Sequence, residues 1–127
     1  MKNYFFDTDI IIDFSRGRNG LLMNFLEKQK EKKCKLWVNA IVMTEFFAGK
    51  SLIEKKNFEK ARKLFDFFGQ IEIGEKVALK TGELLRRGQI DYLADGYIAA
   101  NCLLNNLILV TNNKKHYKKI EDLKIFT

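Results

Sequence analysis

A chain of 127 residues is long enough for one domain but not for two independent cores, so we predict a single domain over residues 1–127. A hydrophobic fraction of 46% with 11 phenylalanines excludes a disordered chain, and no apolar stretch reaches the ~18 residues of a membrane span. The net charge of +7 favours a polyanionic partner, and two widely spaced cysteines exclude a disulfide framework or a metal knuckle.

Short apolar runs alternate along the chain with longer segments of helical periodicity. The first run, Tyr4 to Phe6, ends at Asp7, and similar runs follow at 36–38, 71–73, 107–110 and 125–126. Helical periodicity covers about 21–33, a segment from about Ala40 or Ile41, 52–68, 77–85 and 94–102, and Asn19 is expected to cap the first of these helices. This alternation predicts an α/β fold with a parallel sheet of about five strands, covered on both faces. The N-terminal run is too short for a secretion signal, so we expect a cytoplasmic protein with no membrane contact.

Three carboxylates stand where a predicted element begins or turns. Asp7 closes the first strand, and ligands of parallel sheets collect at the carboxyl ends of strands. Glu45 lies among apolar residues one or two turns into a helix, so we expect it to be partly shielded and to need a polar partner. Asp95 opens a helix, where the dipole favours a carboxylate. Each also has an ordinary structural interpretation, but together they would form a divalent-metal site.

Four further polar residues lie near these carboxylates in the sequence or in the expected fold. The hydroxyls of Thr8 and Thr111 can orient a carboxylate or a phosphate, or can cap a helix or a turn. Asp9 is expected at or near the cap of the helix that follows the first strand. Asp91 stands one helical turn before Asp95, where it either reaches the site or caps the helix.

Five segments, in this order, resemble the motifs of PIN-domain nucleases, and most closely those of the small VapC-type ribonuclease toxins. The resemblance spans essentially the whole chain. The segments are Asp7-Thr8-Asp9, Thr44-Glu45-Phe46-Phe47-Ala48-Gly49, Gly88, Asp95-Gly96-Tyr97-Ile98-Ala99-Ala100, and Leu109-Val110-Thr111-Asn112-Asn113-Lys114-Lys115-His116-Tyr117.

This resemblance implies a three-layer α/β/α sandwich with a central, mostly parallel sheet, and a metal-dependent endoribonuclease that acts as the toxin of a toxin–antitoxin pair. By position, Asp7, Glu45 and Asp95 are the catalytic and metal-binding carboxylates for Mg²⁺ or Mn²⁺. A divalent ion in such a site polarises the scissile phosphate and activates water for in-line attack. The fourth family position, often Asp, is Asn113 here, and its amide brings no negative charge.

The basic residues suit an RNA substrate. A basic rim is expected to attract phosphates toward the acidic centre, and it consists of Lys114, Lys115, Lys118 and Lys119 together with Arg86 and Arg87. His116 is the single histidine. Its lysine neighbours favour a structural role or a place at the substrate edge over that of a general base.

The phenylalanines at 46, 47, 67 and 68 exceed the visible needs of one small core, so we expect a homodimer or a groove that binds an antitoxin segment. Two other functions remain open. One is a catalytically impaired PIN-like RNA-binding or scaffold domain, disabled by Asn113. The other is a phospho-acceptor receiver, but no acceptor Asp follows the apolar run at 36–38.

Overall fold

The computed structural model describes residues 1–18 and 20–127, so the predicted cap Asn19 lies outside the described residues. Within these ranges four strands and eight helical segments alternate, as the periodicity predicted. The strands are β1 (Lys2–Phe6), β2 (Cys34–Val38), β3 (Gly69–Gln70) and β4 (Ile108–Val110). The helices are α1 (Thr8–Ser15), α2 (Leu21–Lys30), α3 (Ala40–Phe47), the 3₁₀ turn η1 (Lys50–Ile53), α4 (Lys55–Phe65), α5 (Glu75–Arg86), α6 (Leu93–Asn105) and α7 (Lys114–Tyr117).

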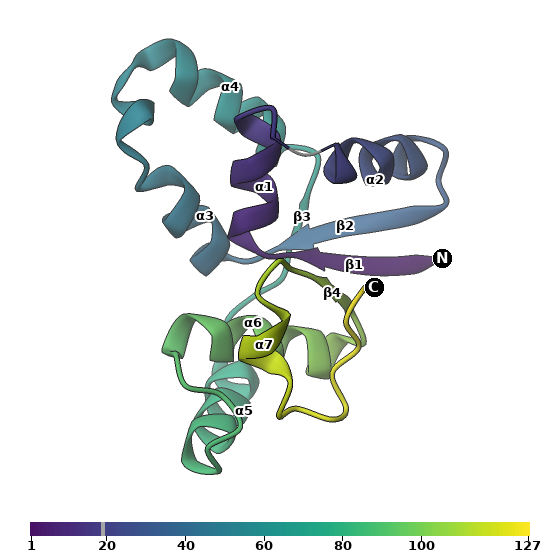
Figure 1. Ribbon diagram of the computed structural model, residues 1–127, viewed down its shortest axis with the longest axis vertical. Helices are drawn as coiled ribbons and strands as arrows, with labels where there is room; N and C mark the ends of the chain where they lie inside the picture. Colours follow the sequence, from purple (N-terminus) through teal and green to yellow (C-terminus); the bar gives the residue numbers. More distant parts are fainter. Residues whose placement is uncertain (19) are drawn as a thin grey trace.

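The sheet is parallel and has the strand order β3-β2-β1-β4. Helices α1 to α4 lie on one side of it and α5 to α7 on the other (Figure 1). The predicted α/β sandwich is therefore confirmed. Because β1 pairs with both β2 and β4, the sheet changes winding direction at β1. In open α/β sheets, ligands bind in the crevice at the carboxyl ends of the strands next to such a point.

Over the described part of the chain, the sheet has four strands rather than about five. The predicted run 71–73 lies beyond β3, which pairs with β2 only through Gly69 and Gln70. The run 125–126 forms a single isolated bridge between Ile125 and Leu109. Ile71 and Ile125 both pack against the core, so their apolar character reflects burial and not strand pairing.

The predicted helix over 52–68 is divided into η1 and α4. The backbone of Glu54 is extended between them, with φ −74° and ψ 122°. None of the helices within the described residues combines the length and the hydropathy that a bilayer span requires.

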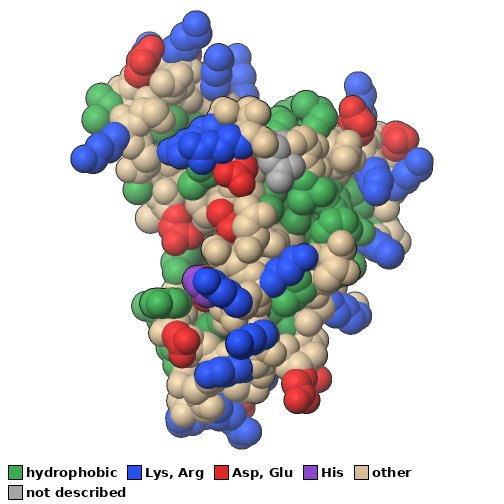
Figure 2. Space-filling model, viewed as in Figure 1, with side chains coloured by type: hydrophobic (Ala, Val, Ile, Leu, Met, Phe, Trp, Pro, Cys, Tyr) green, Lys and Arg blue, Asp and Glu red, His purple; other side chains and the backbone are tan. Residues whose placement is uncertain are grey.

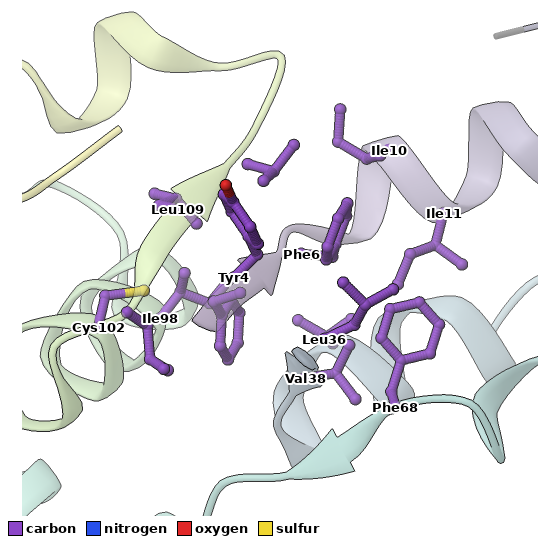
Figure 3. Close-up of a cluster of buried hydrophobic side chains, with 14 of the residues drawn as sticks. Tyr4, Phe6, Ile10, Ile11, Leu36, Val38, Phe68, Ile98, Cys102 and Leu109 are labelled. Atoms are coloured by element: carbon purple, nitrogen blue, oxygen red, sulfur yellow. The ribbon is translucent and has the colours of Figure 1, made fainter. Parts of the chain in front are cut away.

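The core forms around β1, whose side chains reach both faces of the sheet (Figure 3). On one face, the Phe6 ring packs edge-on against Phe25 and Phe68, with centroid distances of 5.1 and 5.8 Å. Cys102 is buried on the other side, as expected for a core cysteine. These contacts hold the last residue of β1 rigidly, and with it the start of the loop that carries Asp7.

Helix α6 approaches α5 closely at Gly96. A Cβ at this glycine would lie 2.8 Å from the Thr81 methyl, and the Thr81 hydroxyl donates to the Gly96 carbonyl at 3.2 Å. A larger residue here would require the Thr81 side chain to move. This contact fixes the first turn of α6, where Asp95 lies.

Candidate active site

Asp7 lies at the centre of the crevice, directly after β1. Its backbone N–H donates to Val110 at the end of β4, at 3.0 Å. Its Oδ1 accepts from the Thr8 backbone N–H at 2.8 Å, so Asp7 also caps α1. Its Oδ2 accepts from the Thr111 hydroxyl at 2.8 Å. Thr111 thus holds a carboxylate in place, which is one of the two roles expected for it.

Asp95 joins Asp7 through a buried phenol. The Tyr117 hydroxyl lies 3.2 Å from Asp95 Oδ1 and 3.4 Å from Asp7 Oδ2. His116 Nδ1 lies 3.0 Å from Asp95 Oδ2. The sequence did not predict this role for Tyr117. The available signal was a single apolar side chain within the lysine-rich segment 114–119, which is typical of a residue that anchors a polar turn to the core.

Glu45 is connected to the site from α3. Its Oε1 accepts from the Thr8 hydroxyl at 2.7 Å, so the threonine next to Asp7 also orients Glu45. The expected shielding is wrong, because Glu45 is exposed. Its apolar neighbours Val42 and Phe46 point into the core instead, which leaves the carboxylate on the open side of the helix.

Asn113 contacts a carboxylate that was not among the predicted ligands. Its Nδ2 donates to Asp9 Oδ2 at 3.0 Å, and its backbone N–H donates to the Thr111 hydroxyl at 3.0 Å. Asp9 is not the helix cap, because Asp7 caps α1 and Asp9 occupies the first turn. Asp9 Oδ1 is buried and has no hydrogen-bond partner among the described residues.

Two of the predicted residues lie away from the carboxylates. Asp91 is exposed, and the residue that caps α6 is Tyr92, with no side-chain cap bond. The capping role predicted for Asp91 is therefore wrong, because the helix starts two residues after it. Lys114 is exposed at the start of α7.

Burial raises the pKa of Asp7 to about 6, and the neighbouring Asp9 charge contributes further. Hydrogen bonds from Thr111 and Thr8 oppose the shift, and the Asp95 charge adds to it. Burial also raises the pKa of Asp9. The pKa of Tyr117 is raised by burial and then by Asp7 and Asp95, so the phenol stays protonated and can donate. The crevice therefore holds more negative charge than its own donors balance.

These residues fit a hard divalent cation. Carboxylate oxygens are the ligands that Mg²⁺ and Mn²⁺ prefer. Within residues 1–18 and 20–127, no three His, Cys, Asp or Glu side chains lie close enough together to bind one ion. The unpartnered Asp9 oxygen and the raised pKa of Asp7 nevertheless indicate uncompensated charge that a cation would neutralise.

A groove of about 420 Å³ leads from Glu45 across helices α1, α3 and α4. It is lined by apolar side chains that include Phe14, Leu52 and Leu64, and by Arg16 and Lys60. Figure 2 shows carboxylates on the face of the molecule that carries the histidine, with Lys and Arg side chains close by. One end of this groove therefore reaches Glu45.

The PIN domain family matches residues 4–122, a range that includes every carboxylate of the crevice. The chain belongs to the PIN domain family. This PIN domain is similar to "Ribonuclease VapC1" of Methanocaldococcus jannaschii, with 27% identity over 94% of this chain and 84% of that protein.

Solved structures agree with the fold over nearly the whole chain. VapBC2 from Rickettsia felis, bound to a DNA fragment from its promoter, gives a TM-score of 0.81 at 26% identity and covers 98% of this chain and 97% of that one. A toxin–antitoxin complex from Klebsiella pneumoniae gives 0.74 at 25% identity, with 98% and 96% covered. The predicted resemblance to the PIN family and to VapC-type proteins is confirmed.

Proposed function

We propose that this PIN domain is a metal-dependent endoribonuclease and the toxin of a toxin–antitoxin pair. The observation that carries the proposal is the hydrogen-bonded link from Thr111 through Asp7 and Tyr117 to Asp95. It joins Asp7, at the carboxyl end of β1, to Asp95, in the first turn of α6. The similarity to a protein named as a ribonuclease supports RNA as the substrate.

Each side chain of the site has a distinct role in the proposed reaction. When bound, a divalent ion would supply charge neutralisation at the scissile phosphate and activation of water. Asp7 and Asp95 would hold it from the sheet side, and the exposed Glu45 from the groove side. Thr8 fixes the orientation of Glu45, and Tyr117 donates between the two aspartates. These donors keep the carboxylates in place, so little rearrangement is needed when substrate arrives.

Metal removal tests the proposal directly. Purified protein incubated with total RNA is expected to cut it in Mn²⁺ or Mg²⁺ and to leave it intact in EDTA, and mapping of new 5′ ends would define the target. RNA binding without turnover in either ion would instead support the impaired RNA-binding or scaffold domain. Cleavage that persists in EDTA would contradict the metal dependence.

An aromatic pair beside Asp95 is suited to contact with the substrate. Tyr92 is 61% exposed, and its ring lies 5.5 Å from that of His116, which is itself held by Asp95. Unpaired RNA bases stack on such rings, with about 1–3 kcal/mol per base. We propose that Tyr92 stacks on a base next to the scissile phosphate, while the exposed Arg86 and Arg87 attract the backbone.

Tyr92→Ala is therefore expected to weaken RNA binding about tenfold, the change that corresponds to ~1.4 kcal/mol. The measurement is filter binding of RNA in the presence of EDTA. Tyr92→Phe should bind as the wild type does, and Leu93→Ala, which shortens an equally exposed neighbour, serves as the matched control. Equal loss in the tyrosine and leucine variants would rule out stacking.

The groove beside Glu45 is the proposed antitoxin site. Its apolar lining suits an amphipathic helix or an extended segment, and a basic side chain at the end of that segment would meet the carboxylates. Ser51→Trp, which fills the groove from η1, is expected to abolish inhibition of RNA cleavage by the co-purified partner, whereas Lys55→Trp outside the groove should not. Inhibition that survives Ser51→Trp would place the partner elsewhere.

Of the four surplus phenylalanines, Phe46 and Phe68 are buried and Phe47 is partly buried, so only Phe67, 59% exposed, remains for a partner surface. A homodimer stays a prediction, and a monomer mass in light scattering would contradict it. The cytoplasmic location also stays a prediction, which cell fractionation would test.

A further inference from the structure

Asp9 stands out because one of its carboxylate oxygens is buried and has no hydrogen-bond partner among the described residues. Asp9 Oδ1 is buried without a partner among them, while Oδ2 accepts from the Asn113 amide at 3.0 Å. Leaving a buried acceptor unpaired costs about 1–3 kcal/mol, and more for a charged group. Such a carboxylate either destabilises the folded state or has a positively charged partner that is absent from this structure.

The position of Asp9 points toward the same crevice as Asp7. Asp9 occupies the first turn of α1, which Asp7 caps. Asp9 is also connected to Asp7 by hydrogen bonds that pass through Asn113 and Thr111. Asp9 therefore lies beside the central carboxylate.

Asn113 occupies the position where a fourth acid was expected, and it gives its amide N–H to Asp9. Its own backbone is held by the Thr111 hydroxyl, which also binds Asp7. We propose that Asp9 supplies the fourth negative charge of the cation site, and that Asn113 orients Asp9 instead of contributing a charge itself. This inference rests on the proposed divalent-metal chemistry.

Exchanging Asp9 and Asn113 tests whether Asp9 contributes charge to the cation site, and the test measures metal binding and not RNA cleavage. Mn²⁺ binding is measured by calorimetry, and the Mn²⁺-induced rise in melting temperature is recorded for each variant. Asp9→Asn is expected to weaken Mn²⁺ binding by about tenfold or more. The double exchange, Asp9→Asn with Asn113→Asp, restores one carboxylate to the pair and should recover most of the affinity.

Asp13→Asn is the matched control, since it removes the same charge from the same helix one turn further on, where Asp13 bonds to Asn112 and Arg18. It should bind Mn²⁺ within about twofold of the wild type, because the Asp13 carboxylate already has Arg18 and Asn112 as partners. Asp9→Asn with affinity equal to that of Asp13→Asn would overturn the inference.

Asn113→Asp keeps the test decisive if Asp9→Asn does not fold. Placing a second carboxylate against Asp9 should lower the melting temperature in EDTA and enlarge the rise on adding Mn²⁺. An unchanged rise would contradict the role of this pair. If wild type itself binds no Mn²⁺, the proposed metal dependence fails too. Binding by wild type with no effect of these substitutions would reject only the role of Asp9.

Discussion

Asp7→Asn and Asp95→Asn are each expected to reduce metal-dependent RNA cleavage by at least ~1000-fold. Each substitution removes one of the charges that would hold the cation, and several kcal/mol of transition-state stabilisation corresponds to a change of this size. The measurement is the cleavage rate of a labelled RNA in Mn²⁺. The fold should persist, because an amide can still pair with the Thr8, Thr111 and Tyr117 groups that surround Asp7.

Asp66→Asn is the control for loss of one negative charge, since Asp66 is exposed at the end of α4. It should cleave RNA at the wild-type rate. Circular dichroism of all three variants verifies that they are folded. Wild-type cleavage by folded Asp7→Asn or Asp95→Asn protein would reject the assignment of these carboxylates.

The second large effect concerns the free energy of unfolding of the metal-free protein, measured in EDTA as a function of pH. The pKa of Asp7 rises from 3.8 to about 6 on folding, so the folded state must ionise a buried group as the pH increases. Below pH ~4, Asp7 is protonated in both states and imposes no cost. Stability is lost between pH ~4 and ~6, at about 1.4 kcal/mol for each pH unit, and the full penalty of about 3 kcal/mol applies above this range.

Asp7→Asn removes this penalty, so the variant should unfold at a higher temperature than wild type at pH 7.5 in EDTA. The two proteins should converge toward pH 4. Calorimetric unfolding of both proteins from pH 4 to pH 8 measures the difference and cancels the contributions of other carboxylates. Saturating Mn²⁺ should stabilise wild type and leave Asp7→Asn little changed. A difference between the two proteins that does not vary with pH would show that ionisation of Asp7 is not its cause.

The sequence predicted those site residues whose role follows from their position at the end of a strand or the start of a helix. Asp7 was predicted from its place after an apolar strand and Asp95 from its place in the first turn of a helix, and both lie there. The parallel sheet followed from the alternation of apolar runs and helices. Glu45 was placed on the correct helix, but its exposure depends on which way that helix faces, and its neighbours in the sequence do not determine this.

Residues whose role arises from distant contacts were not predictable in this way. Tyr117 meets Asp7 across 110 positions, and Asn113 meets Asp9 across 104. Neither pairing has a local periodicity that would reveal it. For this reason Asp9 was expected only as a residue at or near the helix cap, and Asn113 was interpreted as a weak replacement for an acid rather than as the partner of one.

The wide separation of Asp7 from its hydroxyl donors has a consequence for biosynthesis. Thr111 and Tyr117 reach Asp7 from 104 and 110 residues further along the chain. While the ribosome is making the intervening segment, the aspartate has neither of these donors. The proposed nuclease centre can therefore assemble only after Tyr117 has been made, which leaves a cell that interval in which to supply the proposed antitoxin.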